Sequence, residues 1–103
     1  MIQTTIPKTW QLITDQGVQK FKRQFSFPDF KTALQFVNQV GQLAEKLNHH
    51  PVIELTWGSV TIWWWSHDAQ KVTNRDIQAA QATDELYEAL GASSISGTNS
   101  TKP

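Results

Sequence analysis

The segment that most constrains the fold is residues 52–67, VIELTWGSVTIWWWSH, which alternates around Gly58 and Ser59. A Gly-Ser pair suits a two-residue turn between antiparallel strands, and this turn would pair Trp57 with Val60. One face of the predicted hairpin is then apolar throughout and consists of Ile53, Leu55, Trp57, Val60, Ile62 and Trp64. Because such a layer must be covered, the pattern predicts a two-layer domain with helices packed on this face.

The opposite face of the same hairpin is also rich in aromatic side chains. It carries Val52, Glu54, Thr56, Thr61, Trp63, Trp65 and His67. Each tryptophan offers about 150–250 Å² of surface, and such a patch is rarely left in water. The two outer tryptophans therefore indicate either a subunit interface or a ligand platform, and we favour the interface.

The N-terminal part of the chain predicts a second hairpin. Residues 10–14 read as a short strand, residues 15–17 as a turn, and residues 18–27 alternate with a period of two. The apolar face of the longer strand carries Phe21, Phe25 and Phe27. Arg23 interrupts this face, so its guanidinium must reach solvent or an acidic partner.

Two segments have the period of amphipathic helices. The first would begin with Pro28 and span about twenty residues. It would end near Asn48 or His49, since Pro51 disfavours helical geometry at the residue before it. Its predicted inward stripe is Phe30, Ala33, Val37, Val40, Ala44 and Leu47. The second begins at the capping-box spacing of residues 73–76, with an inward stripe of Ile77, Ala80, Thr83, Tyr87 and Leu90.

The element order is therefore β-β-α-β-β-α. It predicts an α+β fold in which a four-stranded antiparallel sheet carries two helices on one face. Residues 1–9 are expected to be a flexible lead-in and residues 10–90 the single domain. Residues 91–103 are rich in Ser, Thr and Gly and have no periodicity, so they predict a disordered tail.

Composition excludes several classes of function. Nine Lys+Arg balance nine Asp+Glu without a basic stripe, so no nucleic-acid partner is predicted. The absence of Cys excludes disulfides, thiolate nucleophiles and Cys-based zinc sites. No apolar run approaches the ~20 residues of a membrane span, and the first ten residues lack the features of a secretory leader. We expect a soluble, cytoplasmic protein.

The histidines form the candidate chemical site. Glu45 and His49 are four residues apart, which places them on one helix face, while Pro51 directs His50 into the following strand. In the predicted register His67 lies opposite His50, so all three imidazoles would converge at one end of the hairpin. Ordinary surface or core histidines, helix capping and a zinc site are the alternatives. Adjacent histidines suit one tetrahedral ion poorly, and we predict no metal.

These residues resemble a known signature. It consists of Glu45-x3-His49-His50-Pro51, then Trp57, His67 and Asp76. The pattern is similar to that of the pterin-4a-carbinolamine dehydratases, and the resemblance runs from Trp10 through the second helix. It includes the F-x-F-x-D-F entry to the first helix at residues 25–30. Asp76 alone could equally be explained as a helix cap by its spacing from Thr73.

The resemblance implies a lyase of the hydro-lyase class. Its reaction converts a 4a-hydroxytetrahydropterin to the quinonoid dihydropterin, which recycles the tetrahydrobiopterin-type cofactor of aromatic amino-acid hydroxylases. No metal or organic cofactor is implied, and the assembly would be a homodimer or homotetramer. The resemblance implies His49 and His67 as the proton-transfer pair, His50 as a pterin ligand and Glu45 as an orienting carboxylate.

The remaining residues that the resemblance places at the pterin site are Trp10, Asn48, Pro51, Ser66 and Asp76. Many members carry Asp where this chain has Asn48. Some relatives act instead as a dimerisation cofactor of a transcription factor or as assembly factors. The alternative function is therefore a non-catalytic module that binds a protein partner through the Trp-rich sheet face.

Overall fold

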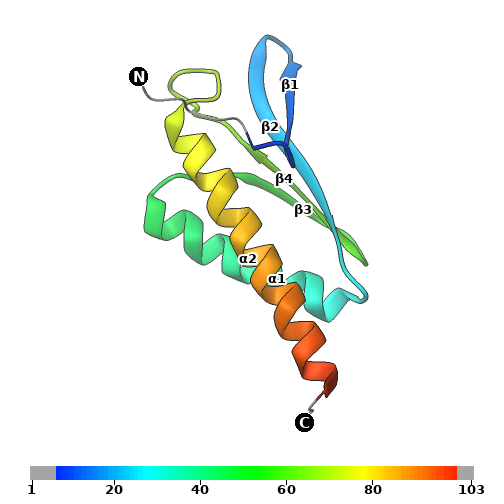
Figure 1. Ribbon diagram of the computed structural model, residues 1–103. Coiled ribbons are helices and arrows are strands. Elements are labelled where there is room, and N and C mark those ends of the chain that lie inside the picture. Colours follow the sequence, from blue (N-terminus) through cyan, green and yellow to red (C-terminus); the bar gives the residue numbers. More distant parts are fainter. Residues whose placement is uncertain (1–6, 100–103) are drawn as a thin grey trace.

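The chain forms one antiparallel sheet with two helices against it (Figure 1). The computed structural model describes the backbone of residues 7–99 and the side chains of residues 7–90. In chain order the elements are β1 (Gln11–Asp15), β2 (Val18–Ser26), α1 (Phe30–Leu47), β3 (Val52–Leu55), β4 (Ser59–Trp64) and α2 (Asn74–Asn99). The predicted element order and α+β class are confirmed.

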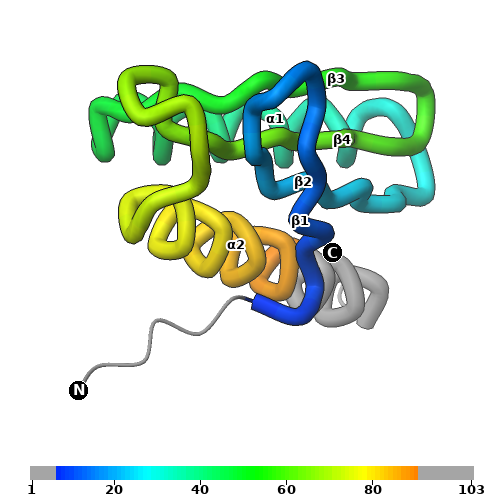
Figure 2. Tube along the Cα trace, turned by 90° about the horizontal axis from the view of Figure 1, so that it is seen from above, coloured from blue at the N-terminus to red at the C-terminus, as the bar shows by residue number. Residues whose placement is uncertain are grey.

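The core lies between the helices and the inner face of the sheet. The strands are ordered β1-β2-β4-β3, so β2 and β4 are central. α1 contacts β3 and β4, whereas α2 contacts β2 and β4. Figure 2 shows α1 behind β3 and β4, with α2 running on the side of β2. The buried apolar residues are Trp10, Phe21, Phe25, Ala33, Phe36, Val40, Ala44, Val60, Ile62, Trp64, Ala79 and Ala80.

The register of the β3–β4 hairpin differs from the prediction by two residues. Leu55 pairs with Val60, and the Thr56 N–H donates to the Ser59 carbonyl at 2.9 Å. The turn is therefore centred on Trp57 and Gly58. Contacts between the Thr56 and Ser59 hydroxyls at 2.8 Å, and from the Phe27 N–H to the Gly58 carbonyl at 2.9 Å, hold it there.

This shift leaves the two faces of the hairpin as predicted, because moving by two residues preserves the alternation of side chains. It does change the position of one residue, Trp57, and the predicted cross-strand partner of another, His50. Trp57 moves from the predicted apolar layer to the turn, where it is 71% exposed. The predicted pairing of His67 with His50 is wrong, since the observed register would place His50 opposite Trp65 instead.

The β1–β2 hairpin agrees with its prediction. Gln16 and Gly17 have φ angles of 53° and 80°, as a tight turn with left-handed residues requires. The buried face of β2 carries Phe21 and Phe25. Arg23 on the same face was predicted to reach solvent or an acidic partner. It forms an ion pair with Asp84 on α2, with 2.5 Å between Arg23 Nη1 and Asp84 Oδ1.

α1 begins two residues later than predicted. Asp29 is the N-cap, and its side chain accepts the Thr32 N–H at 2.8 Å. The hydrogen bonds from Thr32 lower the pKa of Asp29 below its ordinary value. The buried stripe is Ala33, Phe36, Val40 and Ala44. The predicted stripe omitted Phe36 and included Phe30 and Leu47, which are exposed at 45% and 39%.

α2 extends further than the sequence pattern indicated. The predicted tail began at Gly91, whereas the helix continues to Asn99. No Pro interrupts this stretch, and a helix that is already packed gains one backbone hydrogen bond for each residue added. Residues 1–6 and 100–103 lie outside the described residues, so the lead-in and the end of the tail stay predictions. Neither helix within residues 7–99 combines the length and apolarity needed to cross a membrane.

Candidate functional site

A left-handed residue at the end of α1 directs the first two histidines to different places. Asn48 has φ 53° and ψ 44°, and its N–H and that of His49 donate back to Glu45 and Ala44. The chain therefore leaves the helix axis before His49, and the predicted contact of Glu45 with His49 is wrong. Glu45 Oε2 instead lies 2.6 Å from His50 Nε2, in a pair that is mostly exposed to solvent.

His49 lies buried between the sheet and α2. Its side chain is 7% exposed, and its Nε2 lies 2.6 Å from Oδ1 of Asp76. Its ring stacks on Trp64 of β4, with centroids 5.4 Å apart and an interplanar angle of 26°. The ring is therefore held both by a carboxylate and by an aromatic surface.

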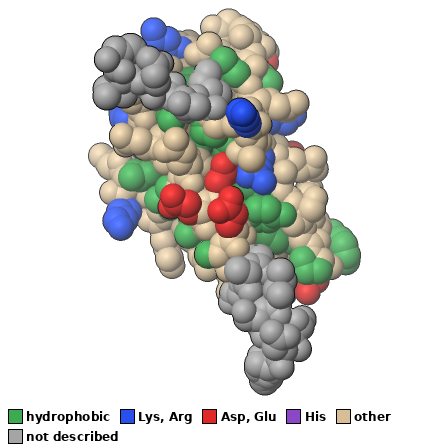
Figure 3. All heavy atoms as spheres, in the orientation of Figure 1, with side chains coloured by type: hydrophobic (Ala, Val, Ile, Leu, Met, Phe, Trp, Pro, Cys, Tyr) green, Lys and Arg blue, Asp and Glu red, His purple; other side chains and the backbone are tan. Residues whose placement is uncertain are grey.

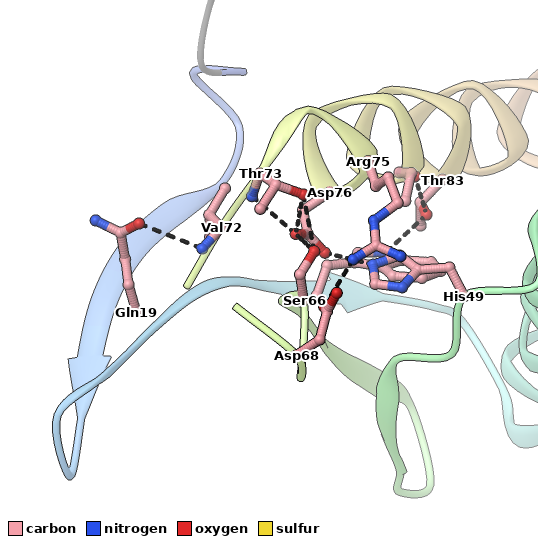
Figure 4. A network of polar contacts seen from close by, with 11 residues as sticks. Gln19, His49, Ser66, Asp68, Val72, Thr73, Arg75, Asp76 and Thr83 are labelled. Atoms are coloured by element: carbon pink, nitrogen blue, oxygen red, sulfur yellow. Dashed lines mark hydrogen bonds and ion pairs between the residues drawn. The ribbon is translucent and has the colours of Figure 1, made fainter. Parts of the chain in front are cut away.

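Asp76 is the centre of a buried polar network (Figure 4). Its side chain is fully buried, and its Oδ2 accepts the Ser66 hydroxyl at 2.7 Å and the Thr73 N–H at 2.9 Å. The Ser66 and Thr73 hydroxyls lie 2.8 Å apart. Asp76 thus has the capping role that its spacing predicted and also binds His49. All its contacts come from groups that can donate a hydrogen bond to a carboxylate.

Replacing Asp76 with Ala is expected to lower the free energy of unfolding by about 3 kcal/mol, since it leaves buried donors without an acceptor. Chemical denaturation measures this change. Asp68→Ala is the matched control, because Asp68 makes an exposed ion pair with Arg75 at 2.8 Å, and it should leave the denaturation midpoint unchanged. Equal midpoints for the two variants would contradict the central role of Asp76.

The backbone at Asn48 makes a second prediction about stability. Asn48→Ala should destabilise the protein by about 1 kcal/mol, because a β-carbon disfavours the left-handed conformation that Asn tolerates. Asn48→Gly should retain the wild-type stability, since glycine adopts this conformation readily. Thermal unfolding of the two variants measures the difference. The reverse order of stability would show that the Asn48 side chain, rather than its backbone, holds the turn.

His67 lies in the loop that follows β4. It comes directly after Ser66, whose N–H donates to the Lys71 carbonyl at 3.0 Å and closes the loop. Its exposed ring stacks on Trp65 with centroids 4.4 Å apart. The neighbouring Asp68 has a pKa below its ordinary value because Arg75 donates a hydrogen bond to it. His67 is connected to the Asp76 network only along the chain, because the preceding residue, Ser66, hydrogen-bonds to Asp76.

Trp10 lies outside this network. It is buried against Phe25, and its Nε1 donates to Asp84 Oδ1 at 2.8 Å. Asp84 is eight residues, or roughly 12 Å, along α2 from Asp76. α2 also carries Glu85 and Glu88 in this region, and Figure 3 shows acidic side chains gathered on this side of the molecule. Because Trp10 is buried and packs against Phe25, it is a residue of the hydrophobic core.

The structure groups the predicted site residues into two sets. His49, Ser66 and Asp76 are joined by hydrogen bonds, and Glu45 and His50 form a separate pair at the surface. Asn48 and Pro51 flank the two histidines in the chain, one exposed and the other half-buried. Among the described residues, no group of three His, Cys, Asp or Glu side chains is placed to hold a metal ion.

Sequence reasoning predicted the capping contact of Thr73 with Asp76 but missed one contributor to the site. Trp64 supports the His49 ring. This contact depends on tertiary packing between β4 and the end of α1, and no local pattern reports it.

Comparison with known proteins gives a consistent result. Residues 1–86 match the family model described as "Pterin 4 alpha carbinolamine dehydratase". A protein of Chlorobium limicola is 43% identical over 79 residues, covering 77% of this chain and 70% of that protein. A protein of Syntrophotalea carbinolica is 44% identical over 79 residues with the same coverage. Both are named, provisionally, as pterin-4-alpha-carbinolamine dehydratases.

Two solved structures share the fold. A transcriptional coactivator/pterin dehydratase from Brucella melitensis has a TM-score of 0.70 and 32% identity, covering 78% of this chain and 83% of its own. A pterin dehydratase-like protein described as a RuBisCO assembly factor in the alpha-carboxysome has a TM-score of 0.66. The second is 18% identical and covers 77% of this chain and 89% of its own, so it supports the fold alone.

Proposed function

Because this chain belongs to the pterin-4a-carbinolamine dehydratase family, we propose that it dehydrates a 4a-hydroxytetrahydropterin to the quinonoid dihydropterin. The proposed mechanism is general acid–base catalysis by His49 and His67 without a metal or organic cofactor. The observation that carries it is the buried contact between His49 and Asp76. The pair is costly to remove from water, and the carboxylate holds the imidazole in one orientation, as a proton-transfer group requires.

In this proposal Asp76 sets which nitrogen of His49 transfers a proton. The Asp76 carboxylate lies 2.6 Å from Nε2 and is assigned as the acceptor of the proton there, which leaves Nδ1 to take up or release one. The same carboxylate stabilises the imidazolium that forms when Nδ1 is protonated. His49 is therefore suited to donate and accept a proton repeatedly without changing its orientation.

The reaction needs two proton transfers. The C4a–O bond breaks, the departing hydroxide takes a proton from an acid and leaves as water, and a base removes the N5 proton as the C4a–N5 double bond forms. Imidazole has an ordinary pKa of about 6.5 and can serve in either role near neutrality. His67 supplies the second imidazole, from the loop that Ser66 connects to Asp76.

The exposed pair of Glu45 and His50 is suited to bind the pterin. In this proposal the Glu45 carboxylate orients the His50 ring through the 2.6 Å contact, and the ring faces the substrate from the rim of the site. We assign further pterin contacts to Asn48 and Pro51, which lie beside the histidines in the chain. Ser66 is fully buried and is proposed to act on the site through its hydrogen bond to Asp76.

An assay with pterin carbinolamine generated in the reaction mixture tests the proposal. The wild-type protein is expected to accelerate loss of the carbinolamine relative to buffer. The control is the double variant His49→Ala/His67→Ala, which should return the rate to that of buffer. A folded wild-type protein that gives no acceleration would overturn the dehydratase proposal.

A second candidate function is protein binding through the outer face of the sheet. Val52 is exposed on this face, and Trp63 and Trp65 are only half-buried beneath Lys22 and Lys20. We expect both tryptophans to become buried in a homodimer, a homotetramer or a complex with a protein partner. This candidate becomes the favoured function if the wild-type protein fails in the pterin assay.

A further inference from the structure

The end of β4 places one tryptophan against each histidine of the proposed proton-transfer pair. His49 stacks on Trp64 at 5.4 Å and 26°, and His67 stacks on Trp65 at 4.4 Å and 30°. Trp64 is the last residue of β4 and Trp65 follows it directly. Each imidazole is therefore supported by its own tryptophan at the point where the strand ends.

The two rings differ in what else holds them. His49 is buried and hydrogen-bonded to Asp76. His67 is exposed, and within residues 7–90 its imidazole has no hydrogen-bonded side chain; Gln70 contacts only its carbonyl, at 3.4 Å. An exposed side chain without such a partner changes rotamer on the picosecond to nanosecond timescale. The stack on Trp65 is therefore the contact that restrains the His67 ring.

The Trp65 ring is itself held by the sheet. It is half-buried, and the Lys20 ammonium lies 4.3 Å from the centroid of the indole. Lys20 is in turn paired with Asp15 at the end of β1, at 3.2 Å. A cation over an indole face is an attractive contact. β1 and β2 thus fix the surface on which His67 rests.

We propose that Trp65 is a positioning residue that holds the His67 imidazole in the orientation needed for proton transfer. The inference rests on the proposed dehydratase function. Losing the stack should slow the chemical step more than it weakens pterin binding, because small misplacements of a proton-transfer group are costly to the rate.

The test compares Trp65→Leu with Trp65→Phe, which keeps an aromatic surface. Trp65→Leu is expected to lower kcat about ten-fold with KM changed less than about two-fold, and Trp65→Phe should recover most of kcat. Trp63→Leu is the matched control, because Trp63 occupies the same outer face beneath Lys22 at 5.7 Å without a stacked histidine. It should keep the wild-type kcat.

Proton NMR of the imidazoles supplies a measurement that does not depend on activity. The indole ring current should shift the His67 ring protons upfield in the wild type and in Trp63→Leu, but not in Trp65→Leu. The His49 protons should stay unchanged in all three, since Trp64 is intact.

The outcomes separate this inference from the proposed function. An active wild type whose kcat and His67 shifts survive Trp65→Leu would overturn the inference and leave the dehydratase function standing. An equal loss of kcat in Trp63→Leu would also overturn it, because the outer face as a whole would then be responsible. An inactive wild type would overturn both.

Discussion

The pterin dehydration rate is expected to fall by roughly 10²- to 10⁴-fold when His49 is replaced by Ala, the range that removal of a general acid or base produces. In the proposed mechanism Asp76 orients one nitrogen of this ring and the other serves the substrate, and an Ala side chain supplies neither. Steady-state kinetics with carbinolamine generated in the reaction mixture measures the loss. It should appear in kcat, with added imidazole restoring part of the activity.

The adjacent histidine provides the matched control for this experiment. His50→Ala removes an exposed ring paired with Glu45, so it should raise KM and largely preserve kcat. Circular dichroism establishes that both variants are folded. If His49→Ala kept more than about a tenth of the wild-type kcat, its assignment as a proton-transfer group would be wrong.

The largest expected effect on stability is that of Trp64→Ala, which should lower the free energy of unfolding by about 4 kcal/mol. Trp64 is fully buried, and its Nε1 donates to the Thr83 hydroxyl at 3.1 Å. The substitution removes the largest fully buried side chain and also the surface beneath His49. Urea denaturation with an unchanged m-value measures the loss directly.

Trp57→Ala is the matched control because it removes the same side chain from a site that is 71% exposed. It should change the free energy of unfolding by no more than about 0.5 kcal/mol. A value for Trp64→Ala below about 2 kcal/mol would mean that the core closes around the missing ring, contrary to the packing described above.

The alternation of apolar and polar residues was sufficient to predict both faces of the sheet, but not its register. Val60, Ile62 and Trp64 are buried as their period of two requires. A turn at Gly58-Ser59 and one at Trp57-Gly58 place the same residues on the same faces, so the pattern does not distinguish them. The Thr56–Ser59 contact and the approach of Phe27 decide between the two, and both depend on the folded arrangement.

The composition of the site was more predictable than its pairings. His49, Ser66 and Asp76, which hydrogen bonds join in the structure, were all among the predicted residues, yet a four-residue spacing suggested Glu45 as the partner of His49. The left-handed Asn48 breaks that spacing, and Asn before a His-His-Pro run is a readable signal for it. The true partner, Asp76, lies 27 residues away in sequence, and this contact required tertiary structure.

The carboxylate of Asp84 has a mechanical consequence for the site. It accepts hydrogen bonds from the side chains of Thr9, Trp10 and Arg23, so α2, β2 and the segment before β1 are joined at one point. Sliding α2 by one turn, about 5.4 Å, would break all three contacts together. These contacts therefore fix the middle of α2 against β2 and the segment before β1, eight residues beyond Asp76.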